Sequence, residues 1–295
     1  MPNTLSLKFN DNLKSLLDEY VERFNRPEFI ADDPISIPHR FSNPRDIEIT
    51  AFWTAILAWG QRKSIINSAN RLFEYMDNAP YDFIKNHQET DRKRFEAFKH
   101  RTFQPIDALY FLEFLQQFYN ENDSLETAFA RHLTGFGFEM SDFGTLPTSD
   151  ILNPKSEAPS VSAALIGFNK DFFDLPDAPH RTRKHVSTPL SKSTCKRLCM
   201  FLRWMVRRDD CGVDFGIWQT IKPSQLLMPL DVHVERHARR LGLLERPQTD
   251  WQTVLELTKN LRQFDPEDPV KYDFALFGMG IVEKKEFADF WDKVT

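Results

Sequence analysis

The chain has 295 residues, which allows one large domain or two modest ones and a substantial core without cross-links. Its hydrophobic content of 41% excludes a disordered chain, and its 10 glycines argue against a turn-rich β fold or a glycine-rich phosphate loop. The formal net charge of −5 argues mildly against nucleic acid, unless the basic residues cluster. Three cysteines make no disulfide framework. We find no signal-peptide pattern and no apolar run of about 18 residues, and we expect a cytoplasmic protein that does not span a membrane.

The first third of the chain predicts helices. Asn43 and Pro44 form a start signal for a helix that Gly60 ends, and Ser64 is expected to cap a second helix after a short turn. Two further amphipathic stretches predict helices within residues 5–24 and over residues 105–119.

Residues 134–192 differ in composition, because they hold six of the 18 prolines with scattered serine, aspartate and glycine. We expect an irregular region with a short helix near Val161–Ile166. A segment this long is typical of an insertion or of a linker between domains.

Residues 194–208 predict a helix with an apolar stripe of Leu198, Phe201, Leu202 and Met205. Lys196, Arg203 and Arg207 have the spacing of the opposite face. The stretch from Arg181 to Arg208 holds nine lysines or arginines and no acid. A solvated helix face would explain part of it, but the charges continue into the preceding loop, which favours a surface that contacts phosphates.

Residues 229–243 predict a short helix that begins after Asp231 and ends at Gly242. In one interpretation Asp231 is only an N-cap, worth about 1 kcal/mol. In the other, the helix N-terminus keeps this carboxylate ionised so that it can face a developing positive charge.

Residues 230–236 read Leu-Asp-Val-His-Val-Glu-Arg and are followed by Arg-Leu-Gly-Leu at 240–243. They resemble the end of the helix-hairpin-helix, Gly/Pro-rich, Asp signature of the DNA glycosylase superfamily that includes endonuclease III. Residues 56–61 and 272–280 are similar to two other core helices of that superfamily. The run around residues 196–207 also resembles a bacterial family of hypothetical proteins.

This resemblance implies an all-α, two-lobed fold in which residues 1–295 form a single glycosylase-like unit. Residues 25–133 and 193–245 would form the core bundle with a degenerate hairpin, residues 134–192 an insertion, and residues 1–24 with 246–295 the second lobe. We expect no metal and no cofactor, and the iron–sulfur cluster of endonuclease III is excluded because no cysteine follows Cys211.

The sequence departs from the superfamily at the hairpin. The superfamily's hairpin usually reads Leu-Pro-Gly-Val-Gly and has a catalytic lysine 18 positions before the aspartate, whereas residues 208–216 here offer only Gly212 and Gly216 and no lysine. Lys196, 35 positions before Asp231, is the best substitute, and the archaeal 8-oxoguanine glycosylase branch is similar in placing its lysine farther upstream. Lys222, nine positions before Asp231, is the weaker candidate.

The resemblance implies a glycosylase of base-excision repair that binds double-stranded DNA as a monomer and flips out a damaged or modified base, such as an 8-oxoguanine-like base. Asp231 would stabilise the oxocarbenium-like sugar, and Lys196 would either form a Schiff base, giving lyase activity, or contact a phosphate. Gln61 would fill the space that the flipped base leaves in the DNA base stack, or it would act as a plain helix cap. The candidate DNA contacts are Gln61, Arg62, Lys63, Arg181, Arg183, Lys184, Lys192, Arg197, Arg203, Arg207, His233 and Arg236.

Three alternatives remain open. A non-catalytic DNA- or RNA-binding protein could keep the glycosylase fold, and the degenerate hairpin favours it. The acidic net charge leaves room for a pure protein-interaction role. His233 and His237 could share one helix face beside Asp231 as metal ligands, but the neighbouring arginines disfavour a cation there.

Overall fold

The computed structural model describes residues 11–133 and 161–282. Within these ranges the chain forms helices joined by turns and loops, with no strand beyond the isolated bridge between His100 and Phe103. The prediction of an all-α protein is therefore confirmed for the described residues. The predicted irregular region begins with residues 134–160, which lie outside them.

The α-helices are α1 (Asp11–Phe24), α2 (Pro44–Leu57), α3 (Arg62–Glu74), α4 (Pro80–Asn86), α5 (Glu89–Arg92), α6 (Pro105–Glu121), α7 (Glu126–Ala130), α9 (Val161–Phe172), α10 (Lys196–Val206), α11 (Val232–Arg240), α12 (Trp251–Leu261) and α13 (Tyr272–Ile281). Single 3₁₀ turns occur at Pro27–Phe29, Pro34–Ser36, Pro38–Arg40, Lys93–Ala97, His180–Lys184, Pro189–Ser191, Pro223–Gln225 and Pro269–Lys271. None of the described helices is both long enough and apolar enough to cross a membrane.

Helix α2 begins as the sequence predicts, because the side chain of Asn43 accepts a hydrogen bond from the backbone N–H of Arg45 at 2.9 Å. It ends at Leu57, before the turn at Gly60. The predicted cap of the next helix is wrong: α3 starts two residues before Ser64, and Gln61 is its N-cap residue. Gln61 caps without a side-chain hydrogen bond and is exposed.

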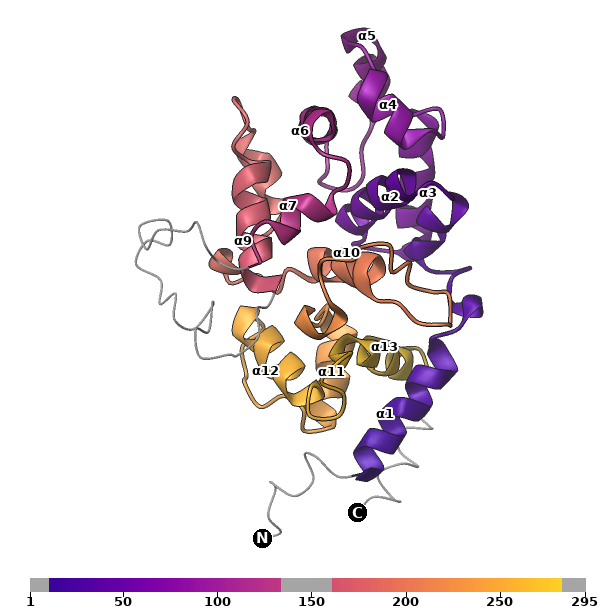
Figure 1. Ribbon diagram of the computed structural model, residues 1–295, viewed down its shortest axis with the longest axis vertical. Coiled ribbons are helices and arrows are strands. Elements are labelled where there is room, and N and C mark those ends of the chain that lie inside the picture. Colours follow the sequence, from indigo (N-terminus) through magenta and orange to yellow (C-terminus); the bar gives the residue numbers. More distant parts are fainter. Residues whose placement is uncertain (1–10, 134–160, 283–295) are drawn as a thin grey trace.

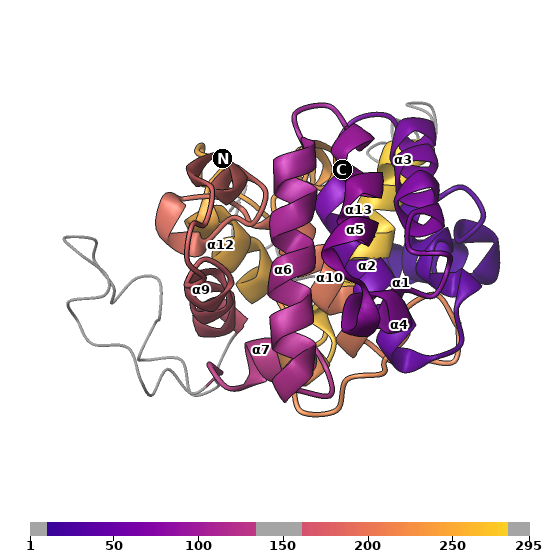
Figure 2. The same ribbon diagram turned by 90° about the horizontal axis from the view of Figure 1, so that it is seen from above.

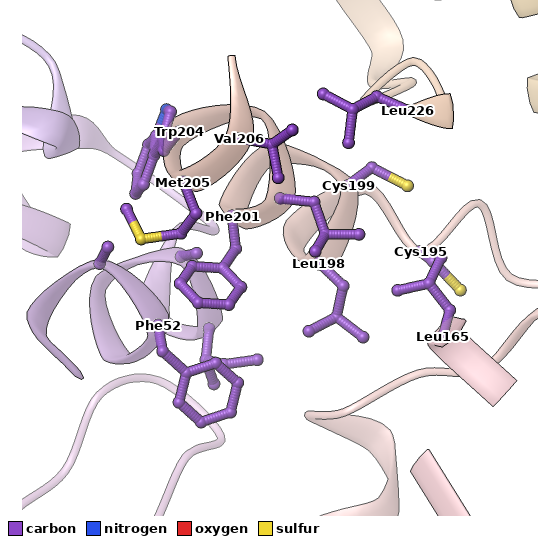
Figure 3. Packing of buried hydrophobic residues seen from close by; sticks show 14 of the residues in the cluster. Phe52, Leu165, Cys195, Leu198, Cys199, Phe201, Trp204, Met205, Val206 and Leu226 are labelled. Carbon is purple, nitrogen blue, oxygen red and sulfur yellow. The ribbon is translucent and has the colours of Figure 1, made fainter. Parts of the chain in front are cut away.

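Helix α10 lies at the centre of the molecule, between α2 and the group formed by α11, α12 and α13 (Figure 1). Its predicted apolar stripe is confirmed: Leu198, Phe201, Leu202 and Met205 are all buried. Figure 3 shows Phe201 facing Phe52 of α2, and the two ring centroids are 5.5 Å apart. The opposite side of α10 is buried as well, so this helix has no solvated face in its second half.

The first and last described helices, α1 and α13, pack against each other, on the side of α6 away from α9 and α12 (Figure 2). Gly278 makes this close approach possible, because a Cβ atom there would lie 2.2 Å from the ring of Phe24. The first and the last described helix are therefore neighbours in the fold.

Several helices differ from the sequence prediction, among them α9 and α12. The short helix expected near Val161–Ile166 continues to Phe172, because Phe168 and Phe172 pack among the rings of α6 and α7. Helix α12 was not predicted, although Asp250 is a regular N-cap for it and accepts from the backbone N–H of Thr253 at 3.2 Å.

Candidate functional site

Asp231 is the N-cap of α11, as the sequence predicts. Its Oδ1 accepts hydrogen bonds from the backbone N–H groups of His233 at 2.8 Å and Val234 at 2.9 Å. These two bonds fix the side chain and leave Oδ2 outside the cap. The helix N-terminus therefore holds a carboxylate in one orientation with one oxygen available for another partner.

That partner is Lys196, the first residue of α10, whose Nζ lies 3.5 Å from Asp231 Oδ2. The Lys196 side chain is 31% exposed and that of Asp231 is 17% exposed, so solvent or a ligand can reach the pair. The other candidate lysine, Lys222, is exposed, and its Nζ donates to the backbone oxygen of Gln219 at 2.7 Å. Of the two lysines, the structure places Lys196 beside Asp231.

The Lys196–Asp231 pair lines a pocket of about 750 Å³. Five aromatic side chains contribute to its wall: Phe29, Trp59, Trp204, Phe274 and Phe277. Phe29 meets the rings of Phe274 and Phe277 edge-on, at centroid distances of 5.5 and 5.9 Å. An apolar, aromatic wall with a few converging charged groups is the usual composition of a site for a small organic ligand.

Two further carboxylates, Asp33 and Asp273, line the same pocket. Burial raises the pKa of Asp273 to about 7; the nearby Arg203 opposes this shift and Asp231 adds to it. Burial also raises the pKa of Asp33, partly offset by a backbone hydrogen bond from Ile35 and by nearby cations. The pocket thus holds one carboxyl group, that of Asp273, whose protonation can change near neutral pH, and a second, that of Asp33, whose pKa is raised by burial.

Arg203 and Arg207 do not face solvent, so their prediction as DNA contacts is wrong. They are 4% and 3% exposed. Arg203 pairs with Asp273 and, through Nε at 3.2 Å, with Asp214, while Arg207 pairs with Asp209, Asp214 and Asp268. Helix periodicity placed both arginines opposite the apolar stripe, but α13 and the loop after α10 cover that side.

Two other predicted DNA contacts are also engaged within the protein. Arg197 donates to the backbone oxygens of Ile56 at 2.6 Å and Lys184 at 3.1 Å. Arg181 pairs with the fully buried carboxylate of Asp107. Both guanidinium groups already hold loops in place, and both side chains are only partly buried, so their contact with phosphates stays a prediction.

The remaining predicted contacts are exposed: Gln61, Arg62, Lys63, Arg183, Lys184, Lys192, His233 and Arg236. Arg62, Lys184 and His233 belong to the pocket lining itself. The Arg62 guanidinium lies over the ring of Phe277, 5.1 Å from its centroid. We call the exposed cations Arg62, Lys63, Arg183 and Lys184 the basic rim of the pocket.

The segment expected to form a degenerate hairpin is a loop over residues 207–222 with no helix in it. Gly212 and Gly216 both have positive φ, and the loop folds back on α10 through hydrogen bonds from Phe215 N to Trp204 O at 2.8 Å and from Trp218 N to Met205 O at 3.0 Å. Asp214 in this loop is buried against Arg203 and Arg207, so its charge is neutralised rather than presented to solvent.

The two histidines of α11 differ in environment. His233 is exposed, while His237 is buried, and burial together with Arg236, Arg240 and His233 lowers the pKa of His237 to about 4. Across the described residues, no three His, Cys, Asp or Glu side chains are grouped as metal ligands.

Sequence reasoning did not identify Asp33 or Asp273 as site residues. Asp273 carried a signal, because it is the one acidic residue in the apolar run Tyr272–Ile281. A carboxylate inside a buried helix needs a partner or a function. Asp33 carried no comparable signal, since it lies in a polar turn before Pro34.

The sequence profile of a family described as "Protein of unknown function (DUF2400)" matches residues 33–282. This range contains Lys196, Asp231, Asp273 and the rest of the pocket lining except Phe29. No curated protein and no solved structure matches the chain.

Proposed function

This chain belongs to the DUF2400 family, and we propose that it is a DNA glycosylase of the helix-hairpin-helix type that removes a damaged or modified base. The observation that carries the proposal is the Lys196–Asp231 pair, 3.5 Å apart in the lining of an aromatic-walled pocket. A base flipped out of a duplex requires a pocket with π-faces for stacking, and its sugar must then lie beside the reacting groups.

In this proposal Asp231 Oδ2 stabilises the positive charge that develops on the sugar as the C1′–N bond breaks. The Asp231 cap geometry supports this role, because the backbone N–H groups of His233 and Val234 favour the ionised carboxylate and keep it fixed. The electron pair of the broken bond leaves with the base.

Lys196 then attacks C1′ with the lone pair of a neutral Nζ, and loss of its protons with opening of the sugar ring gives a Schiff base. The base we propose is 8-oxoguanine-like, as in the similar archaeal branch; the pocket has both stacking rings and hydrogen-bond acceptors for a purine. Elimination from the Schiff base would cut the strand and give the enzyme its lyase activity.

The basic rim supports binding to duplex DNA. Lys184 lines the pocket, Lys63 and Arg183 are exposed next to lining residues in the chain, and their attraction for phosphates acts locally despite the acidic net charge. The two lobes of the superfamily fold would correspond to residues 25–133 and 193–245 on one side and to residues 1–24 with 246–295 on the other, and residues of both groups line the pocket.

One observation favours a second candidate, a non-catalytic DNA- or RNA-binding protein. The loop at 207–222 lacks the second helix of a hairpin that would present backbone N–H groups to a phosphate. A panel of duplexes, each with one modified base, separates the two candidates: the protein is incubated with each and alkali-sensitive breaks are scored. Breaks at one modified base support a glycosylase, while binding without breaks at any base supports the second candidate.

A further inference from the structure

Asp273 has a position in the pocket that ion pairing alone does not explain. It is the second residue of α13, and its Oδ2 accepts a hydrogen bond from Arg203 Nη1. Among the described residues no hydrogen bond occupies its other oxygen, Oδ1. The side chain lines the pocket and keeps 10% of its surface exposed. One oxygen of this carboxyl is thus anchored, and the other is available to a group in the pocket.

The charged groups that act on Asp273 lie on α10, at the start of α11 and in the loop after α10. Arg203 and Lys196 lie on α10, Asp231 is the N-cap of α11, and Asp214 is in the loop after α10. Lys196 is therefore shared electrostatically between Asp231 and Asp273. The two carboxyls differ in one respect: Asp231 Oδ1 is committed to two backbone N–H groups, which hold it ionised.

We propose that Asp273 is a proton relay between Lys196 and the leaving base, with Asp231 serving only as an electrostatic stabiliser. This inference rests on the glycosylase function proposed above and assigns its acid–base residue. The geometric basis is the anchored carboxyl, which lines the same pocket as Lys196 and lies next to the aromatic residues Phe274 and Phe277 of the pocket wall.

The proton transfers balance. The ionised Asp273 accepts one proton from the Lys196 ammonium, which leaves a neutral amine with a lone pair. The electron pair of the C1′–N bond departs with the base, and the lysine lone pair then forms the bond to C1′. The Asp273 carboxylic acid then gives the same proton to the departing base nitrogen and returns to its ionised form. No oxidant or other reactant is needed.

A relay must be able to hold and to release a proton at the working pH. Burial, the largest effect, raises the pKa of Asp273 to about 7, which satisfies both requirements near neutrality. Asp33 is not equivalent, because its Oδ1 accepts from the backbone N–H of Ile35 at 3.1 Å and no arginine anchors its other oxygen in the described structure.

The test compares Asp273→Asn with the parent in single-turnover base release between pH 5.5 and 8.5, on the duplex that the parent cleaves. The amide introduced by this substitution still accepts from Arg203 but cannot carry a proton. We expect the parent rate to rise with pH through an inflection near 7, because Asp273 must be ionised to accept the proton. We expect the variant to be slower by about 100-fold at pH 7.5 and to lack the inflection.

Asp268→Asn is the matched control, because Asp268 belongs to the same arginine network, accepting from Arg207 Nε at 2.8 Å, but lies outside the pocket lining. It should keep the parent rate and inflection. Borohydride trapping on a duplex with an abasic site adds a second readout: the Asp273→Asn adduct should form slowly at pH 7 and recover at pH 9, where hydroxide takes the lysine proton.

An Asp273→Asn variant that keeps the inflection and the rate overturns the relay. Equal losses in Asp273→Asn and Asp268→Asn also overturn it, because the network would then act only through structure. If the parent itself releases no base from any duplex and gives no adduct, the glycosylase function fails, and that outcome is distinct from both others.

Discussion

Arg203 of α10 and Asp273 of α13 form a buried, hydrogen-bonded ion pair that connects the central helix to the last described helix. The pair continues into Asp214, which also accepts from Arg207 at 3.1 Å, and so into the loop after α10. This network of ion pairs stabilises one side of the pocket. It fixes the start of α13, where Asp273 lies, relative to α10, where Lys196 lies.

The first prediction concerns the stability of this network. Arg207→Met removes the guanidinium that pairs with Asp209, Asp214 and Asp268, and it leaves the partly buried Asp209 and Asp268 without a cation while Asp214 keeps Arg203. We expect the free energy of unfolding to fall by about 3–5 kcal/mol, measured by urea denaturation. The neighbouring Arg208 is exposed, and Arg208→Met should change it by less than about 0.5 kcal/mol. Equal effects of the two substitutions would show that the network does not stabilise the fold.

The second prediction concerns the basic rim. Lys63→Glu combined with Lys184→Glu should weaken duplex binding. The variant's affinity should also depend less steeply on salt: the negative slope of log affinity against log salt should shrink in magnitude by about 2, since each lost phosphate contact removes roughly 0.9. Lys93→Glu with Lys259→Glu makes the same charge change at exposed positions outside the pocket lining. If both double variants lose the same slope in a fluorescence-anisotropy titration, binding depends on net charge and not on the rim.

The third prediction concerns Asp231. Asp231→Asn preserves a good N-cap and removes only the charge, so the fold should stay intact while base release slows by about 100-fold to 1,000-fold. Asp250→Asn makes the same chemical change at the N-cap of α12, outside the pocket, and should release the base at the parent rate. Unchanged cleavage by Asp231→Asn would reduce Asp231 to a cap.

The fourth prediction concerns pH and His237. Burial, then Arg236, Arg240 and His233, lower the pKa of His237 to about 4, from 6.5 in the unfolded chain. Between these values the unfolded chain binds the proton and the folded one does not, so stability is present above pH 6.5 and is lost as the pH falls toward 4. The loss is about 3 kcal/mol in the free energy of unfolding across this window, measured by denaturation at each pH. His237→Gln should flatten that slope, whereas the exposed His180→Gln should leave it unchanged.

Local signals in the sequence predicted much of the fold. Asn43 and Asp231 are caps because a short polar side chain before an apolar-periodic run satisfies the first free N–H groups of a helix, and this needs no tertiary information. The stripe of α10 follows from periodicity in the same way. Helix α12 was not predicted, although the same two signals are present in it: an N-cap at Asp250 and regularly spaced apolar residues.

The site was predictable only in part. The sequence pattern at residues 230–236 identified Asp231. The distance of Lys196 from Asp231 along the chain and the surrounding basic residues identified Lys196. The same periodicity misassigned Arg203 and Arg207, because a helix repeat says which residues share a face but not whether another element covers that face. The acidic residue in an apolar run marks Asp273 as unusual, but tertiary packing of α13 and of the Pro34 turn brings Asp273 and Asp33 to the pocket, and no pattern within one segment encodes that packing.

The fifth prediction concerns the nucleophile. A lysine that attacks C1′ leaves an imine that borohydride reduces to a stable protein–DNA adduct, detected as a shifted band on a denaturing gel. We expect the parent to form this adduct on its substrate and Lys196→Ala to form none, because Lys196 Nζ alone among the two candidate lysines lies beside Asp231. Lys222→Ala is the control and should form the adduct like the parent, since Lys222 lies outside the pocket lining.

Adduct formation that persists in Lys196→Ala but disappears in Lys222→Ala would transfer the role to Lys222 and require the loop at 207–222 to move on DNA binding. Base release without any adduct in the parent would make the protein a monofunctional glycosylase, in which Lys196 holds a phosphate and Asp231 works with a water molecule as the nucleophile.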